Sequence, residues 1–285
     1  MAQAATGTPS STQTSQPTQT NTPLPTETSI PSTPTPGIGS TMTSDKDGMI
    51  LVYVPAGEFT MGSDSGSDDE KPVHTVTLNA FWIDRTEVTN AMYAKCVQNG
   101  ACTAPSSTES YTRDSYYSNS EFDNYPVIYV SWEDAKAYCS WADRRLPTEA
   151  EWEKAARGTD ANVYPWGNTF DGTLVNFCDT NCSFDWANKS FDDKYADVAP
   201  VGSYPSGKSI YGAVDMAGNV WEWVEDWYDA YPGNTESNSS YGTTYRVLRG
   251  GSWDHYYYYV RSALRNRVNP TDTSNVIGFR CSRSP

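Results

Sequence analysis

The amino-acid sequence predicts an α+β fold with little regular secondary structure for its length of 285 residues. Alternating and β-branched runs in the first third of the chain indicate short strands, and two helix starts carry the capping-box pattern. Beyond residue 158 the chain is rich in Gly, Asn, Asp, Tyr and Trp, with only short apolar runs. This composition is typical of long loops held in place by aromatic side chains. A fold of this kind needs disulfides or bound cations in addition to its core.

The first segment of the chain differs in composition from everything that follows. Residues 1–44 are mostly Ser, Thr, Pro and Gln, with almost no large apolar side chains. Such a segment buries too little apolar surface to offset its loss of conformational entropy, so we predict a disordered linker. Residues 45–285 then form one folded domain of ordinary size.

The early part of this domain contains strand and helix signals in succession. Residues 49–63 indicate a strand, a Pro-Ala-Gly turn and a second strand. The β-branched residues in 74–87 predict another strand. Thr89 or Asn90 then caps a helix that runs toward Gly100.

Two further helices have complete start signals. Ser131 is followed three residues later by Asp134, and Thr148 is followed in the same way by Glu151, so each pair forms a capping box. Gly158 is the stop signal of the second helix. Later strands are predicted near residues 220–224, 246–249 and 278–281.

The six cysteines fall into two close pairs and one distant pair. The spacing suggests Cys96 with Cys102, Cys178 with Cys182, and Cys139 with Cys281, although six cysteines allow about 15 pairings. Disulfides on this scale indicate an oxidising compartment. Together with the Ser/Thr/Pro segment they predict an extracytoplasmic or cell-surface protein. The alternative is a cytosolic protein with buried free thiols.

Charge and hydropathy exclude two classes of partner. The formal net charge is −15, whereas nucleic-acid binding needs clustered Lys and Arg. No window is apolar enough to span a bilayer, and the first residues lack the pattern of a signal peptide. We therefore expect the export signal to lie outside this sequence. The acidic balance suits cations bound by oxygen ligands.

Several motifs occur together in the order of one known family. They are YVPAGEFTMGS at 53–63, RTEVTNAMYAKC at 85–96, PVIYVSWEDAKAYCSWADRRLPTEAEWEKAARG at 126–158, YPWGN at 164–168, YGAVDMAGNVWEW at 211–223, RGGSW at 249–253 and GFRC at 278–281. Over residues 49–283 the chain resembles the formylglycine-generating enzyme family, also called the sulfatase-modifying factor domain. The resemblance implies a C-type-lectin-like fold of that family's subtype. It also supports the pairing of Cys139 with Cys281.

The resemblance also implies two calcium sites made of hard oxygen ligands, which suit calcium better than a soft metal. In one site, Asn176 and Asp193 would give side-chain oxygens, and Phe177 and Tyr195 would give carbonyls. In the other site, Asp215 and Glu222 would give side-chain oxygens, and Gly218 and Val220 would give carbonyls. The alternative is that these acids are solvated or bind backbone amides.

The reactive cysteines of the catalytic family members are missing. In those members, two cysteines that closely follow the GGS motif bind copper(I), which prefers thiolates. Residues 253–260 contain no cysteine. His255 stands near the first cysteine position, but a single imidazole holds copper poorly. Cys178 and Cys182 have a spacing that permits a metal site, yet it fits a local disulfide as well. The sequence therefore favours calcium over copper as the cofactor.

The C-terminal segment carries exchangeable residue types between framework positions that follow the family. The framework positions are 249–253, 261, 263, 265, 270 and 278–281. Asn, or a residue one adenine substitution away from the Asn codon AAC, occupies positions 254, 255, 256–259, 266, 269 and 271–275. This pattern resembles the variable proteins of diversity-generating retroelements, which use the same fold and vary adenines near the end of the gene. Tyr also gives large contacts at low entropic cost. We predict a ligand-binding surface formed by Trp253, Asp254, His255, Tyr256, Tyr257, Tyr258, Tyr259, Asn266, Asn269, Thr271, Asp272 and Asn275.

Other interpretations of this segment remain open. The tyrosines from 256 to 259 also fit a strand in which alternate side chains enter the core. Three functions follow from these alternatives. They are a non-catalytic protein that binds an unknown protein or surface ligand, a copper-dependent oxidase that acts on a sulfatase-type cysteine, and a sensory or structural module of the same fold.

Overall fold

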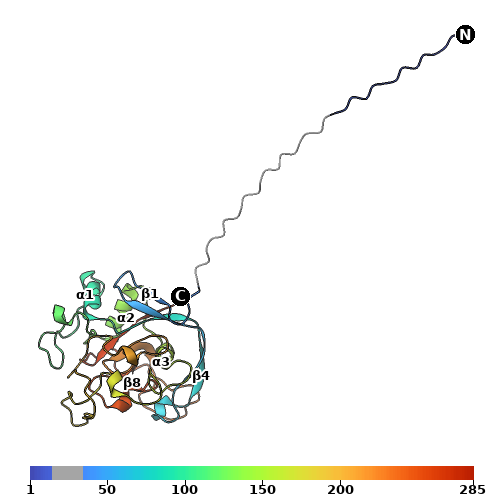
Figure 1. The fold of residues 1–285 in the computed structure, drawn as a ribbon. Helices are drawn as coiled ribbons and strands as arrows, with labels where there is room; N and C mark the ends of the chain where they lie inside the picture. The colour runs from blue at the N-terminus through green and yellow to red at the C-terminus, as the bar shows by residue number, and fades with distance from the viewer. Residues whose placement is uncertain (15–34) are drawn as a thin grey trace. The chain divides into compact units, whose positions relative to one another are not determined.

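The computed structural model describes residues 1–14 and 35–285 (Figure 1). Residues 1–14 form no helix or strand, and the folded unit comprises Pro36–Pro285. Residues 15–34 of the predicted linker lie outside the described part. The linker was predicted to extend to residue 44, but β1, Thr41–Thr43, already belongs to a sheet. Met42 explains the difference, because its side chain packs against the core.

The described strands form two four-stranded sheets and one hairpin. The first sheet has the order β1-β2-β5-β10, the hairpin is β3-β4, and the second sheet has the order β8-β7-β6-β9. Their bounds are Ile50–Val54 (β2), Gly57–Met61 (β3), His74–Leu78 (β4), Phe81–Asp84 (β5), Trp221–Trp227 (β6), Arg246–Arg249 (β7), Arg265–Val268 (β8), Ile277–Phe279 (β9) and Ser282–Arg283 (β10). Of these pairs, β6 and β9 are parallel and the others antiparallel.

Two predicted strands are interrupted in the structure. The segment 74–87 forms both β4 and β5, because β4 pairs with β3 while β5 pairs with β2 in a different sheet. The last predicted strand, 278–281, overlaps β9 only as far as Phe279, and the next strand, β10, begins at Ser282. Arg280 lies at this break, and its guanidinium turns inward to a buried carboxylate.

The helices begin where the caps predict. They are α1, Asn90–Gln98, α2, Trp132–Trp141, and α3, Glu149–Arg157. The Thr89 side chain accepts the first cap hydrogen bond, and both predicted capping boxes are complete. Short 3-10 helices lie at Asp68–Glu70, Ser120–Phe122, Gly172–Leu174, Pro205–Gly207 and Tyr257–Val260.

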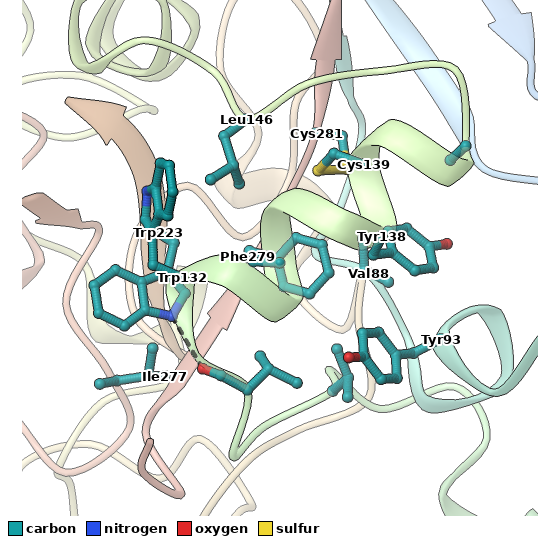
Figure 2. Close-up of a cluster of buried hydrophobic side chains, with 14 of the residues drawn as sticks. Val88, Tyr93, Trp132, Tyr138, Cys139, Leu146, Trp223, Ile277, Phe279 and Cys281 are labelled. Atoms are coloured by element: carbon teal, nitrogen blue, oxygen red, sulfur yellow. Dashed lines mark hydrogen bonds between the residues drawn. A yellow bond between two sulfur atoms is a disulfide. The ribbon is translucent and has the colours of Figure 1, made fainter. Parts of the chain in front are cut away.

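The largest core cluster lies where α1 and α2 pack against β6 and β9 (Figure 2). Its buried aromatic side chains include Tyr93, Trp132, Tyr138, Trp223 and Phe279. The disulfide between Cys139 and Cys281 joins α2 to the chain end across 142 residues of sequence. All three predicted cysteine pairings are confirmed.

Candidate ligand-binding surface

Buried ion pairs hold the framework around the tyrosine run. The framework arginines each pair with a buried glutamate: Arg249 with Glu153, Arg261 with Glu70, Arg265 with Glu149, and Arg280 with Glu222. Three of these pairs are bidentate, with distances of 2.7 to 2.9 Å. Bidentate pairs fix direction as well as distance. The side chains of these four framework arginines are therefore fixed in position by burial and by their ion pairs.

The tyrosine run is a 3-10 turn rather than the alternating strand of the other interpretation. Tyr257–Val260 form the turn, which follows the GGS motif. Gly251 has a φ of 78°, and a Cβ there would lie 2.7 Å from the carbonyl oxygen of Tyr259. Glycine therefore permits both the left-handed backbone and the close approach of the turn.

Exposure separates the run sharply from its neighbours. Among residues 249–265, the positions that are not buried are 254–259. Tyr256, Tyr258 and Tyr259 are exposed, and Tyr257 packs against Phe170 with 5.1 Å between ring centroids. The exchangeable positions are thus accessible as a group.

Trp253 differs from its prediction as a surface residue. Its side chain is only 2% exposed and belongs to a core cluster with Tyr116, Ile128 and Val220. The large indole is covered because the chain enters the turn from the interior. Trp253 therefore supports the surface from beneath and does not present itself to a ligand.

A hollow of about 560 Å³ lies beside the run, lined by Trp186, Asp254, His255, Tyr256 and Tyr259. Trp186 comes from a distant loop, and its indole Nε1 donates to the carbonyl of Asp254 at 2.8 Å. Sequence reasoning missed Trp186. The nearby Cys178 and Cys182, with their close spacing, were a signal that this loop is rigid.

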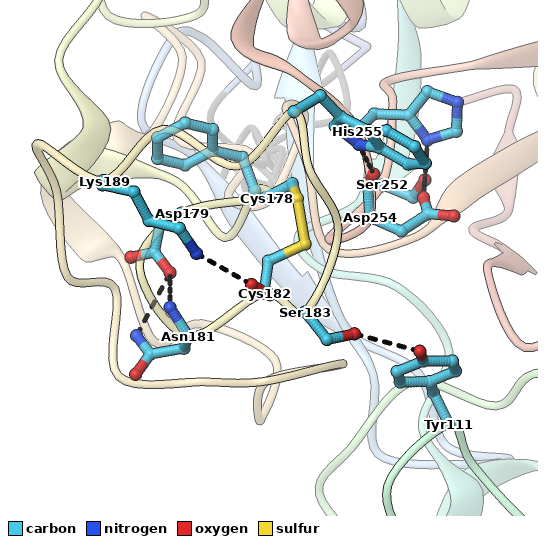
Figure 3. The surroundings of a disulfide bond; sticks show 12 residues. Tyr111, Cys178, Asp179, Asn181, Cys182, Ser183, Lys189, Ser252, Asp254 and His255 are labelled. Carbon is cyan, nitrogen blue, oxygen red and sulfur yellow. Dashed lines mark hydrogen bonds and ion pairs between the residues drawn. A yellow bond between two sulfur atoms is a disulfide. The ribbon is translucent and has the colours of Figure 1, made fainter.

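The disulfide between Cys178 and Cys182 closes this loop, which lies beside Ser252, Asp254 and His255 (Figure 3). The Cys178 amide donates to the carbonyl of His255 at 3.0 Å. The Ser183 hydroxyl of this loop lies 3.0 Å from the hydroxyl of Tyr111, which belongs to a distant segment of the chain. The sequence could not place this cysteine pair beside the tyrosine run, because the contact joins residues far apart in the chain.

His255 is fixed by two polar neighbours. Its Nδ1 lies 2.5 Å from Asp254 Oδ1 and 2.8 Å from the hydroxyl of Ser252. Burial opposes ionisation of Asp254, but the hydrogen bonds and charge of His255 lower the pKa of that carboxyl overall. Both neighbours use the same ring nitrogen, whereas a Ser–His–Asp triad uses both nitrogens. This arrangement orients a side chain and does not resemble a nucleophile with its base.

Tyr259 also lines a second hollow, of about 570 Å³. Tyr258, Asn266 and Arg267 also line it, next to acidic residues of the 3-10 helix at Asp68–Glu70. The structure therefore brings Asn266 together with the tyrosine run.

The remaining predicted surface residues lie outside both hollows. Asn269, Thr271 and Asp272 are exposed in the turn that follows β8, where the Asn269 amide donates to Asp272 at 3.2 Å. Asn275 lies beside Trp253, whose indole Nε1 is 3.5 Å from the Asn275 carbonyl oxygen. They extend the accessible segment without lining the same hollow.

The first predicted calcium set offers one unused side-chain oxygen. The Oδ1 atom of Asn176 is buried and has no hydrogen-bond partner in the described part of the chain. Asp193 accepts the amides of Phe177 at 3.0 Å and Tyr195 at 2.9 Å, which places these residues around one carboxylate. Burial raises the pKa of Asp193 to about 7, and the nearby Asp179 adds to the effect. A buried acid with an unpaired amide oxygen nearby fits a hard cation.

The second predicted set is arranged differently. Both oxygens of Glu222 accept from Arg280, and one also accepts from the Trp152 indole at 2.7 Å. Asp215 accepts the Gly202 amide at 2.6 Å. Because the Glu222 carboxylate is neutralised by an arginine, this set does not fit calcium as arranged.

Two further findings concern membranes and thiols. Among residues 1–14 and 35–285, no helix has the length and apolar character needed to cross a bilayer. All six cysteines are in disulfides, so the described residues include no free thiol.

A family model described as a sulfatase-modifying factor enzyme 1-like domain matches residues 38–285. The serine/threonine-protein kinase Pkn1 of Chlamydia trachomatis is 36% identical over 253 residues, which are 82% of this chain but 38% of the relative. The chain therefore spans well under half of that relative. The formylglycine-generating enzyme of Streptomyces coelicolor is 36% identical over 280 residues, which cover 81% of this chain and 88% of the enzyme.

Solved structures show the same fold. PvdO from Pseudomonas aeruginosa matches 88% of this chain and 100% of its own, with a TM-score of 0.70 and 29% identity. Variable protein 1 of Treponema denticola matches 86% of this chain and 99% of its own, with a TM-score of 0.65 and 23% identity.

Proposed function

Because residues 38–285 belong to the sulfatase-modifying factor enzyme 1-like family, we propose that the chain uses this family's C-type-lectin-like fold to bind a ligand without catalysis. The ligand is a protein or another surface, and the segment 254–277 recognises it. One observation carries the proposal. Within a buried framework, the accessible positions 254–259 coincide with residue types that single adenine changes connect to Asn. We further propose that the chain is a variable protein of a diversity-generating retroelement.

The alternative from the same family is a copper-dependent oxidase. The Streptomyces coelicolor relative bears the name of an enzyme, so the family permits this function. The local chemistry of this chain opposes it, since copper(I) prefers thiolates and each cysteine sulfur is held in a disulfide. His255 would be the donor nearest the tyrosine run, and its Nδ1 already contacts Asp254.

Titration with copper(I) distinguishes the two functions. We expect no thiolate-to-copper absorbance and no aldehyde when the full chain is incubated with oxygen and a cysteine-containing sulfatase peptide. The Streptomyces coelicolor enzyme, assayed in parallel, is the positive control. Aldehyde formation above the no-protein blank, lost in His255→Ala, would replace the binding proposal with the oxidase.

The disulfides support a proposal about the compartment. Three bonds, one of which closes 142 residues, persist best under oxidising conditions. We propose that the domain works outside the cytoplasm, at a cell surface. Labelling of free thiols in protein isolated under alkylating conditions tests this, because the disulfides predict no labelling before reduction.

We also propose that calcium binds at the first predicted set. Asn176 supplies the unpaired Oδ1 and Asp193 the carboxylate, around which the amides of Phe177 and Tyr195 lie. The carbonyls of Phe177 and Tyr195 would complete the proposed set. When bound, the ion would neutralise the buried acid and connect two loops. The proposed recognition of a ligand by the C-terminal segment does not require this ion.

Calcium is expected to raise the melting temperature of the full chain relative to the chelator-treated protein. Asp193→Asn should abolish the increase, because the site loses its charge. Asp160→Asn, which removes an exposed carboxylate elsewhere, should leave it unchanged. Thermal unfolding with calcium, magnesium or chelator measures the effect. An equal increase in wild type and Asp193→Asn would refute this site.

A further inference from the structure

The hollow beside the tyrosine run has a distinct chemical character. Its lining consists of three aromatic rings, from Trp186, Tyr256 and Tyr259, together with Asp254 and His255. Among the residues that the structure describes, no Lys or Arg side chain is part of this lining. The second hollow differs, since Arg265 and Arg267 line it together with Asp68, Asp69 and Glu236.

Trp186 is a fixed platform with one covered face. Its ring stacks on Phe184 with 4.6 Å between centroids and planes 5° apart, and Phe184 packs in turn on the buried Trp253 at 6.2 Å. The indole is nevertheless 52% exposed. With Nε1 bound to the Asp254 carbonyl, the ring is held in place before any ligand arrives.

Asp254 supplies a carboxylate at the same hollow. Its Oδ1 accepts from the Ser252 hydroxyl at 2.6 Å and lies 2.5 Å from His255 Nδ1. The side-chain hydrogen bonds recorded for this carboxylate in the described part of the chain both use Oδ1, and the side chain is 23% exposed. One carboxylate oxygen is therefore available to a donor from outside.

Aromatic faces with a nearby carboxylate attract cations. A guanidinium or ammonium within about 6 Å of a ring centroid is stabilised by the ring quadrupole, and a carboxylate adds a charge-assisted hydrogen bond. The same chain already places arginines over such rings: Arg261 lies 4.0 Å from the Tyr258 ring centroid and Arg246 lies 3.5 Å from that of Trp227. The net charge of −15 favours the approach of a cationic partner.

From these observations we propose that the hollow lined by Trp186, Asp254, His255, Tyr256 and Tyr259 receives a cationic side chain, a guanidinium or ammonium, of the partner. The proposal rests on the ligand-binding function and names the chemistry of its site. Asp254 receives the donors, and Trp186 provides the open face. A neutral sugar ring on the same platform is the competing occupant.

The test uses small probes on the full chain. Binding of Nα-acetyl-arginine amide is measured by calorimetry or by chemical shift changes, with Nα-acetyl-citrulline amide as its neutral isostere and a methyl glycoside as the competing ligand. We expect saturable binding of the arginine probe, at least about tenfold weaker binding of citrulline, and no binding of the glycoside.

Matched variants locate the binding. Asp254→Asn and Trp186→Ala should each weaken binding of the arginine probe by about tenfold or more. Two control variants should leave binding unchanged: Asp160→Asn removes an exposed carboxylate, and Trp166→Ala removes a tryptophan that lines another hollow. Unchanged melting temperatures confirm that the variants fold.

Three results would overturn the proposal. They are equal binding of arginine and citrulline, binding of the glycoside alone, and arginine binding that survives both site variants. None of them concerns whether the segment varies between genes, so a failure here leaves the ligand-binding function to its own test.

Discussion

Replacement of Arg280 by methionine is expected to lower the free energy of unfolding by about 3–5 kcal/mol. Arg280 is fully buried, and its guanidinium donates to both oxygens of Glu222 at 2.7 Å. It also donates to the carbonyls of Asp84, Arg85, Val214 and Asp215. Methionine fills much of the volume but leaves Glu222 as a buried charge without a cationic partner, since only the Trp152 indole still donates to it. Burial already raises the pKa of the neighbouring Glu87 well above its usual range.

Urea unfolding of Arg280→Met and wild type measures this loss. The matched control is Lys136→Met in the exposed pair with Glu225, whose side chains are 45% and 40% accessible at 3.5 Å. It should cost no more than about 1 kcal/mol. Adding Glu222→Gln to Arg280→Met should recover part of the loss, because the unpaired charge is removed. Equal losses in Arg280→Met and the control would contradict the role given to this pair.

Removal of the disulfide between Cys139 and Cys281 is the second large expected effect. The bond closes 142 residues, for which chain entropy predicts a stabilisation of about 5 kcal/mol. The bond between Cys178 and Cys182 spans only 4 residues, which corresponds to about 2 kcal/mol in the same treatment. The double alanine variants should therefore differ clearly in their urea midpoints.

The two bonds should also differ in what else they change. Loss of the short bond frees the loop that holds Trp186 against Asp254. It should therefore weaken binding of the arginine probe clearly, while it lowers the free energy of unfolding only by the small amount given above. Loss of the long bond should lower stability while the remaining folded molecules still bind the probe. The reverse pattern would show that the short bond is structural and not part of the recognition surface.

Local signals explain which parts of the fold were predictable. The caps at Thr89, Ser131 and Thr148 lie within three residues of the amides they bind, so the helices begin as predicted. The cysteine pairings followed from spacing and resemblance. The division of 74–87 into β4 and β5 was not predictable, because it depends on which sheet each half joins.

The site was only partly predictable for a similar reason. The run 254–259 is accessible as expected, but Trp186 reaches it across 68 residues of sequence. A tryptophan such as Trp253 can lie at a binding surface or in a core. Its packing against Tyr116 and Val220 places it in the core. The glutamates that pair with the framework arginines are likewise distant in the chain.

Sequencing of the DNA beside this gene, in several related strains, tests the central claim most directly. A variable recognition surface predicts a near-copy of the codons for 254–277 with AAC at the exchangeable positions, next to a reverse transcriptase gene. It also predicts that strains differ at 254–259 while Trp253, Arg261 and Arg265 stay constant, because these are buried. A locus without such a repeat, with the codons for 254–259 invariant among strains, would contradict a variable recognition surface.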